Sequence, residues 1–151
     1  MIHLNERNIL HMDLDTFFVS CERLIDSRLN SKPVLIGGTS DRGVVAACSY
    51  EARRFGIHSA MPMRMAKQLC PEAIVLRGNS GIYSKYSTMV TDIIKENVPL
   101  YEKSSIDEFY IDLSGMDKFF GSYKLASELR NKVIKETGLP ISFGLSINKT
   151  V

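Results

Sequence analysis

The feature that most constrains the fold is an alternating segment that begins with two adjacent acids, Asp107 and Glu108. After these acids every second side chain is apolar, at positions Phe109, Ile111 and Leu113. A period of two is typical of a β-strand with one buried face and one polar face. Ser104 and Ser105 precede the acids and favour a turn. The segment therefore predicts a β-hairpin that carries two carboxylates at its tip.

Two adjacent acids are also compatible with an ordinary solvated turn, so a functional interpretation needs further residues. Residues 9–14 read Ile-Leu-His-Met-Asp-Leu, with apolar side chains on both faces of a predicted strand. This pattern is typical of a strand that is buried inside a sheet. Asp13 lies at the C-terminal end of that strand and is the candidate third carboxylate.

The order of predicted elements indicates an α+β fold. A strand and a helix come first, a small α/β excursion occupies roughly residues 17–78, and the order β-α-β-β-α-β remains once the excursion is removed. The long helices are expected near residues 82–93 and 122–137. This order resembles a ferredoxin-like split βαβ sheet with helices on one face and the other face open. In that topology Asp13 and the acidic tip lie at one end of neighbouring central strands.

The last predicted strand, residues 141–147, alternates bulky apolar residues with the small residues Ser142, Gly144 and Ser146. The bulky face is expected to pack on helices. The small face leaves room for something large to approach the sheet.

The excursion contains a candidate phosphate site. A helix is predicted at Tyr50–Phe55, with Ser49 as its N-cap. Tyr50 and Arg53 share a face of that helix because they are three residues apart. A helix N-terminus, a phenol and a guanidinium together suit phosphate binding, and an ordinary surface turn is the alternative.

The helix predicted after the first strand contains an aromatic residue, Phe18, that is close to Asp13 in the sequence. Asp15 is expected to cap this helix. A core stripe is predicted at Phe17, Cys21 and Leu24. Phe18 lies one residue off the stripe, and simple packing is the alternative to a functional role.

Composition adds limits on the setting. The net charge is only +2, but residues 21–77 carry nine Lys or Arg against five Asp or Glu. This excess suits a phosphate-bearing partner or an ordinary solvated face. The cysteines lack disulfide or zinc spacing, so reduced, buried thiols are expected at Cys21, Cys48 and Cys70. The methionines at 61, 63 and 65 are expected to fill the core, and a cytoplasmic protein without membrane span or signal peptide is predicted.

Three carboxylates within a few ångströms repel one another unless a cation neutralises them. Ligation by oxygen alone selects a hard ion such as Mg²⁺ or Mn²⁺. Two such ions about 3.5–4 Å apart hold the attacking and leaving oxygens of a phosphoryl transfer. The acids therefore predict this chemistry if the fold gathers them.

Several blocks in a fixed order carry a family resemblance. They are Met12–Phe18 with Cys21–Glu22, Ala47–Ile57, Met61–Pro62, Ser105–Asp112 and Gly144–Lys149. From Ile9 to Val151 the chain resembles the Y-family translesion DNA polymerases, most closely the bacterial DNA polymerase IV type. The resemblance implies that Asp13, Asp107, Glu108 and the main-chain carbonyl of Leu14 are metal ligands for two Mg²⁺ ions, which Mn²⁺ can replace. Asp107 and Glu108 are the implied catalytic residues.

The resemblance also implies a nucleotide site. Tyr50 and Arg53 would hold the incoming triphosphate. Phe18 would be the steric gate, because an apolar ring offers a ribose 2′-hydroxyl no partner and leaves it no space. Ala46 and Ala47 would lie in the part of the small inserted lobe that covers the nascent base pair.

The implied layout is a palm at residues 1–16 and 79–151 and fingers at 17–78, with the thumb and little finger absent from this chain. The implied partners are primer–template DNA, a deoxynucleoside triphosphate and a sliding clamp contacted through the missing C-terminal part. The expected function is primer extension in translesion synthesis, weak for these residues alone. A palm-fold nucleotide cyclase and a catalytically silent fragment are the alternatives.

Overall fold

The computed structural model describes residues 7–40, 42–113 and 119–148, and the chain forms two compact units. The first, called the sheet unit below, comprises Met1–Asp15 and Ser84–Val151. The second, called the inserted unit, comprises Thr16–Tyr83. The sheet unit contains a four-stranded antiparallel sheet and the inserted unit a three-stranded mixed sheet. The expected α+β class is confirmed.

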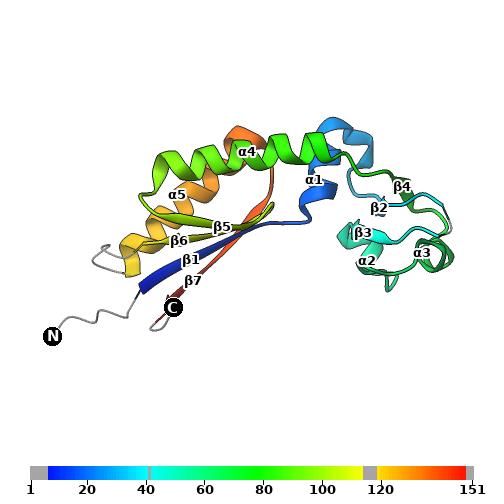
Figure 1. Cartoon of the computed structure of the whole chain (residues 1–151), viewed down its shortest axis with the longest axis horizontal. Coiled ribbons are helices and arrows are strands. Elements are labelled where there is room, and N and C mark those ends of the chain that lie inside the picture. The colour runs from blue at the N-terminus through cyan, green and yellow to red at the C-terminus, as the bar shows by residue number, and fades with distance from the viewer. Residues whose placement is uncertain (1–6, 41, 114–118, 149–151) are drawn as a thin grey trace. The chain divides into compact units, whose positions relative to one another are not determined.

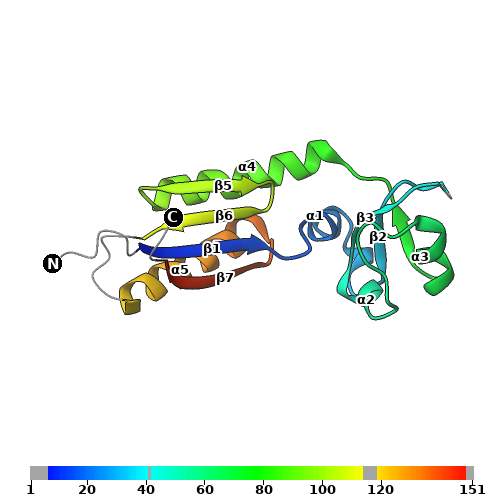
Figure 2. The ribbon, with the colours of Figure 1, turned by 60° about the horizontal axis from the view of Figure 1, so that its bottom comes forward.

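The four-stranded sheet has the order β5-β6-β1-β7 (Figure 2). Its strands are β1 (Arg7–Leu14), β5 (Tyr101–Ser105), β6 (Glu108–Asp112) and β7 (Ile141–Asn148). All neighbouring pairs are antiparallel. This is the order of the expected ferredoxin-like fold. It makes β1 and β6, which carry the candidate acids, the two central strands.

Two helices, α4 (Ser80–Asn97) and α5 (Phe119–Thr137), cover one face of this sheet (Figure 1). Alternation along each strand directs every second side chain toward the helices. The core between the layers is formed by Leu10, Met12, Phe109, Ile111, Val90, Ile94, Leu129 and Val133, all buried. Burial of each large apolar side chain contributes about 1.5–3 kcal/mol, so this layer holds the central strands in register.

The opposite face of the sheet carries polar side chains. His11 and Asp13 on β1 and Tyr110 on β6 point to this side, because they alternate with buried neighbours. Gly144 on β7 lies opposite His11, and a Cβ added there would meet nothing within 4 Å. Within the described ranges no helix covers this face (Figure 1). The sheet therefore presents an open polar surface, as the alternation in β7 predicts.

The hairpin turn differs from the predicted one. Ser104 and Ser105 belong to β5, and the turn consists of Ile106 and Asp107. The prediction was wrong because a bulge between Lys103 and Ser105 lets β5 continue until Ser105 pairs with Glu108. A two-residue connection then closes the hairpin.

The inserted unit is a small sheet of order β3-β2-β4, in which β2 is antiparallel to β3 and parallel to β4. Its strands are β2 (Val34–Gly37), β3 (Val45–Cys48) and β4 (Ile74–Leu76). Its helices are α1 (Phe17–Ile25), the 3₁₀ turn η1 (Ser27–Leu29), α2 (Tyr50–Arg53) and α3 (Met63–Leu69). Leu35 contributes to one buried apolar cluster, and its neighbours Val34 and Ile36 contribute to another. The small sheet thus has apolar packing on both faces.

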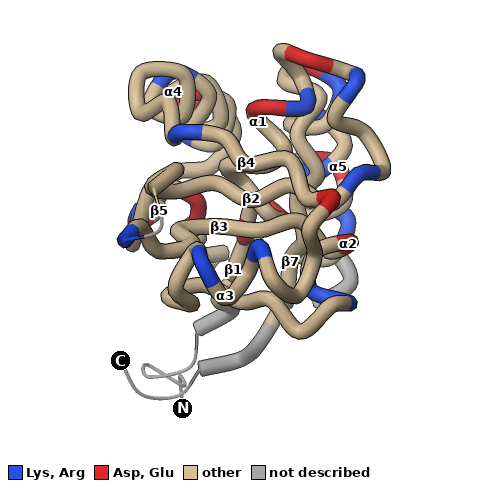
Figure 3. The backbone as a smooth tube through the Cα atoms, turned by 90° about the vertical axis from the view of Figure 1, so that its right-hand side faces the viewer, with Lys and Arg blue, Asp and Glu red and all other residues tan. Residues whose placement is uncertain are grey.

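Local signals in the inserted unit were partly right. The Ser49 Oγ accepts a hydrogen bond from the Ala52 N–H at 3.2 Å, which confirms the predicted cap of α2. Leu24 and Met65 are 41% and 48% exposed, so their assignment to the core was wrong. The buried residues of α1 end at Cys21, before Leu24, and those of α3 are Met63 and Ala66, on either side of Met65. The sequence of α2 contains one cation, Arg53, and that of α3 contains two, Arg64 and Lys67 (Figure 3).

The predicted cap at Asp15 was also wrong. Thr16 occupies the N-cap position of α1 in a left-handed conformation, with φ at 40°, and it makes no side-chain capping bond. The Asp15 carboxylate instead accepts the hydroxyl of Ser142, whose Oγ lies 2.7–2.8 Å from both oxygens. The Asp15 side chain therefore binds a residue of β7 and does not cap α1.

All three cysteines have free, buried thiols, as expected. Burial raises the pKa of the Cys21 thiol to about 12, so this thiol stays protonated at neutral pH. Across residues 7–40, 42–113 and 119–148, no helix is long and apolar enough to cross a lipid bilayer.

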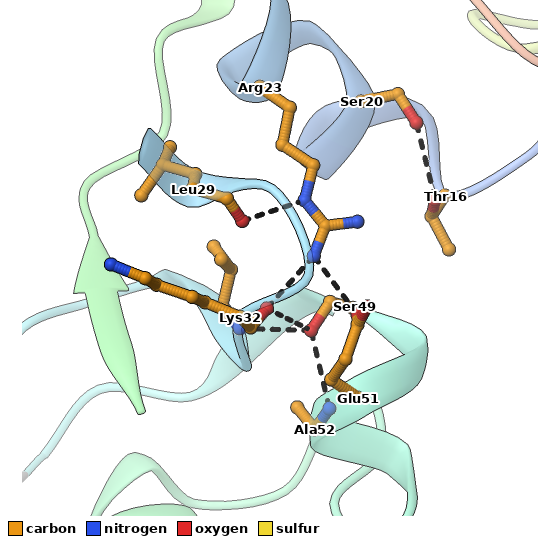
Figure 4. A network of polar contacts seen from close by, with 9 residues as sticks. Thr16, Ser20, Arg23, Leu29, Lys32, Ser49, Glu51 and Ala52 are labelled. Atoms are coloured by element: carbon orange, nitrogen blue, oxygen red, sulfur yellow. Dashed lines mark hydrogen bonds and ion pairs between the residues drawn. The ribbon is translucent and has the colours of Figure 1, made fainter. Parts of the chain in front are cut away.

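Arg23 joins three segments of the inserted unit through its guanidinium (Figure 4). Its Nε donates to the Leu29 carbonyl at 3.0 Å. One of its terminal nitrogens, Nη2, donates to the Lys32 carbonyl at 2.8 Å and to the Glu51 carboxylate at 3.0 Å. Because both Arg23 and Glu51 are mostly buried, water replaces these bonds poorly.

We expect Arg23→Ala to lower the free energy of unfolding of the inserted unit by about 1–3 kcal/mol, because two carbonyls and a carboxylate lose their donor. Urea unfolding followed by far-UV circular dichroism measures the change. Arg28→Ala is the matched control, since its ion pair with Asp26 lies at the surface. Equal midpoints for the two variants would contradict this role of Arg23.

Candidate functional site

The two central strands bring the predicted acids to one end of the open face. Asp13 on β1 is the direct register partner of Glu108 on β6. Side chains that are directly opposite in an antiparallel pair share a face, with Cβ atoms about 4.5–5.5 Å apart. The Leu14 N–H donates to the Asp107 carbonyl at 2.9 Å, which fastens the hairpin turn to the end of β1. The backbone therefore places all three acids near the same strand ends.

One hydroxyl contacts two of the acids. The Ser105 Oγ lies 3.0 Å from Asp107 Oδ1 and 3.3 Å from Glu108 Oε2. Because a hydroxyl has one proton, it donates to one carboxylate at a time, and the two acids share this donor. The sequence pattern assigned Ser105 only to a turn. Its position two residues before Asp107, at the end of a strand, is the signal that points to this contact.

The carboxylates affect one another electrostatically. The pKa of Asp13 is raised above its ordinary value, first by burial and then by the negative charges of Asp107 and Glu108. The nearby His11 opposes this shift. The ionised form of Asp13 is therefore disfavoured, and a bound cation would reverse the effect.

The donor chemistry of this cluster fits a hard divalent cation, because its candidate ligands are carboxylate oxygens. Over the described part of the chain, however, no three His, Cys, Asp or Glu side chains already gather closely enough to enclose an ion. Glu108 Oε1 lies 3.4 Å from His11 Nε2. The backbone already places the acids near the same strand ends. Binding of an ion would therefore require only that the acidic side chains move closer together.

We expect Asp13→Asn to raise the thermal midpoint of the metal-free chain by a few degrees. The folded-state pKa of Asp13 is raised, so the folded state holds its proton to higher pH than the unfolded chain does. Above that pKa the ionised carboxylate lowers stability, and the neutral amide removes this cost. Melting in EDTA at pH 7 measures the change.

We expect Mg²⁺ to raise the midpoint of the unmodified chain, because binding to the folded state stabilises it, and we expect Asp13→Asn to lose that rise. Glu102→Gln is the matched control, since this exposed acid lies on β5 away from the cluster. A lower midpoint for Asp13→Asn in EDTA would show that the acids do not repel one another.

His11 is a further residue of the open face. Its ring stacks on Tyr110, with centroids 4.8 Å apart and planes at 30°. Its Nε2 is buried and makes no hydrogen bond within the described residues, because the contact with Glu108 Oε1 at 3.4 Å lacks hydrogen-bond geometry. The only signal in the sequence is its spacing of two from Asp13, which puts both side chains on one face.

The candidate phosphate residues belong to the inserted unit. The Arg53 guanidinium carbon lies 5.0 Å from the centre of the Tyr50 ring, and both side chains are exposed. The structure thus brings these two predicted residues together at the surface. On β3, Ala46 is exposed and Ala47 is half-buried, opposite Ile36.

Phe18 is half-buried on α1 and stacks on Tyr83, with centroids 4.4 Å apart and planes at 12°. The Tyr83 hydroxyl donates to Glu22 Oε2 at 2.6 Å. No pattern in the sequence connects Tyr83 with Phe18, so this partner was missed. The predicted residues therefore form two sets, acids in the sheet unit and nucleotide-binding candidates in the inserted unit.

Comparisons of sequence and of structure with known proteins both find similarity to DNA polymerases. The chain is 46% identical over 147 residues to DNA polymerase IV of Treponema denticola, covering 97% of this chain and 37% of that protein. It is also similar to the solved insertion ternary complex of Dbh DNA polymerase, with a TM-score of 0.87 and 26% identity, over 92% of this chain and 42% of that one. A Y-family DNA polymerase chimera of Dbh and Dpo4 matches with a TM-score of 0.88 and 26% identity, over 91% and 42%.

The chain thus spans about two fifths of the length of these relatives. A profile of the impB/mucB/samB family matches residues 12–151. The match includes β6, the end of β1 that carries Asp13, and the whole inserted unit, and the resemblance to Y-family polymerases is confirmed. By sequence and by fold, the chain belongs to the impB/mucB/samB family.

Proposed function

We propose that this chain is the catalytic core of a template-directed DNA polymerase that adds deoxynucleotides to a primer 3′ end in translesion synthesis. The observation that carries the proposal is the register of Asp13 opposite Glu108, with Asp107 fastened beside them. Phosphoryl transfer by a two-metal mechanism needs carboxylates that hold the divalent cations beside the reacting phosphate. Relatives that bear the name DNA polymerase IV support the assignment of substrate.

Asp13, Asp107, Glu108 and the main-chain carbonyl of Leu14 would hold two Mg²⁺ ions, with Mn²⁺ as a substitute. When bound, the ions supply charge neutralisation at the reacting phosphate. Asp107 and Glu108 act as the catalytic pair of the hairpin. Ser105 orients their carboxylates, since its hydroxyl contacts both.

Tyr50 and Arg53 would bind the triphosphate. Both side chains are exposed, and the stacking of the guanidinium on the phenol ring limits its motion. Phe18 is the proposed steric gate against the ribose 2′-hydroxyl. Ala46 and Ala47 offer small side chains to the nascent base pair, which suits a site that accepts damaged templates.

The proposed division is a palm at residues 1–16 and 79–151 and fingers at 17–78. Primer–template DNA and a deoxynucleoside triphosphate are the proposed partners, in the cytoplasm. A sliding-clamp contact is assigned to parts that the relatives have beyond this region. Because the relatives are more than twice as long, residues 1–151 alone are expected to bind DNA weakly and to extend a primer slowly.

Primer extension under single-turnover conditions tests the proposal. The chain in excess is incubated with a labelled primer–template, four deoxynucleoside triphosphates and Mg²⁺, and a second reaction contains EDTA. The same chain joined to the C-terminal part of the Treponema denticola relative provides a second enzyme. Template-dependent extension in Mg²⁺ alone is expected, faster with the joined chain.

Extension by neither enzyme would overturn the proposal. Conversion of nucleoside triphosphate to a cyclic product without any primer would instead identify a nucleotide cyclase. The joined chain guards against a false negative, because it restores the length of the relatives.

A further inference from the structure

In the inserted unit, two successive contacts connect the Glu22 carboxylate to the ring of Phe18. Phe18 and Glu22 lie four residues apart on α1, and therefore on the same side of the helix. Tyr83 contacts both, through stacking on the Phe18 ring at 4.4 Å and a hydrogen bond to Glu22 at 2.6 Å. One tyrosine thus connects the acid to the aromatic ring.

The hydrogen bond determines where the tyrosine ring can lie. Tyr83 is 4% exposed, and a buried phenol that loses its partner carries a desolvation cost. Burial and the bond to Glu22 raise the pKa of Tyr83 far above its ordinary value, so the hydroxyl remains a donor at neutral pH. A short bond to a carboxylate is also stronger than one between neutral groups. Rotation of the Tyr83 ring away from Phe18 would break it.

The position of the Phe18 ring in turn depends on Tyr83. The planes are at 12°, which is close to parallel, whereas Phe17 meets both rings at a tilt. Phe18 is half-buried and also packs against the apolar cluster of Val19, Leu29, Val34 and Ile36, so the stack on Tyr83 restrains the part of the ring that this cluster leaves uncovered. The Phe18 ring can exclude a 2′-hydroxyl only if moving the ring out of the way costs free energy. The stiffness of the stack therefore limits the selectivity of the gate.

We propose that Glu22 and Tyr83 are positioning residues that hold the Phe18 ring in place and so set the preference for deoxyribose over ribose. This inference rests on the proposed function, because it assumes that Phe18 is the gate. The specificity is built from three residues: the ring that meets the sugar, the ring behind it and the carboxylate that fixes the second ring.

Nucleotide binding by the chain itself tests the proposal. Titration with dATP and with ATP in Mg²⁺, followed by ¹H–¹⁵N NMR, measures the two dissociation constants even when binding is weak. The readout is their ratio, Kd for ATP over Kd for dATP. A purely structural role would change both constants alike and leave the ratio unchanged.

Tyr83→Phe keeps the ring and removes only the hydroxyl, and Glu22→Ala removes the acceptor from the other side. Each is expected to lower the ratio about threefold to tenfold, since a restrained ring becomes free to move. The double variant should be no worse than either single one, because both remove the same bond. Glu22→Gln keeps an acceptor oxygen and is expected to retain most of the ratio. Tyr123→Phe, which removes an exposed phenol hydroxyl from α5, is the matched control.

The outcomes separate this inference from the proposed function. If the unmodified chain prefers dATP and Phe18→Ala removes the preference, while Tyr83→Phe and Glu22→Ala both keep it, the positioning role is overturned and the gate stands. If the unmodified chain shows no preference, the gate assignment itself is wrong and the inference falls with it. Since Tyr83→Phe conserves shape, it remains informative even if Glu22→Ala proves unstable.

Discussion

Replacing Asp107 with alanine is expected to abolish Mg²⁺-dependent primer extension, with a loss in rate of about three orders of magnitude or more. Metal ions contribute several kcal/mol to the transition state of phosphoryl transfer, and each 1.36 kcal/mol corresponds to a factor of ten in rate. The measurement is single-turnover extension by the joined chain described above.

The fold should survive this substitution. The bond that fastens the turn to β1 uses the main-chain carbonyl of Asp107, which alanine keeps. The carboxylate itself contacts Ser105 near the surface. Glu102→Ala is the control, since it removes an exposed acid from the neighbouring strand without touching the cluster. Extension at the normal rate by Asp107→Ala would remove Asp107 from the metal site.

Replacing Phe18 with alanine is expected to admit ribonucleotides, with a fall of about 10- to 100-fold in the preference for deoxynucleotides. Burying a hydroxyl without a partner costs about 1–3 kcal/mol in proteins, and an open, hydrated space removes that cost. The ratio of kcat/KM for dCTP over CTP, measured with the joined chain, gives the change.

Phe55→Ala is a suitable comparison, because it removes an exposed aromatic ring from the same unit. It should leave sugar selectivity unchanged. A Phe18→Ala enzyme that discriminates between the two sugars as well as the unmodified one does would rule out the gate.

The sequence is most informative where one local pattern decides the outcome. The alternation over 108–113 predicted the buried residues Phe109, Ile111 and Leu113, because the period of a strand determines its faces. The strand that carries Asp13 was placed beside this one by topology alone. Both central strands, and hence the neighbourhood of the acids, follow from short-range patterns and chain order.

The contacts that refine the site join residues far apart in the chain, and no local pattern encodes them. The Asp15 carboxylate binds Ser142, 127 residues away, instead of capping the adjacent helix. Glu22 and Tyr83 are 61 residues apart. Competition between a local cap and a distant hydroxyl depends on tertiary geometry, so the nearest partner in sequence was the wrong choice for Asp15.

The pairing of Asp13 with Glu108 has a consequence for how the family can vary its length. A one-residue deletion inside β6 would reverse the parity of the strand, so that carboxylates would turn toward the helices and apolar residues toward water. Substitutions change one side chain at a time, whereas such a frame change would misdirect the whole strand. Tolerated insertions and deletions should therefore fall in the connecting segments, and the two central strands should keep a constant length.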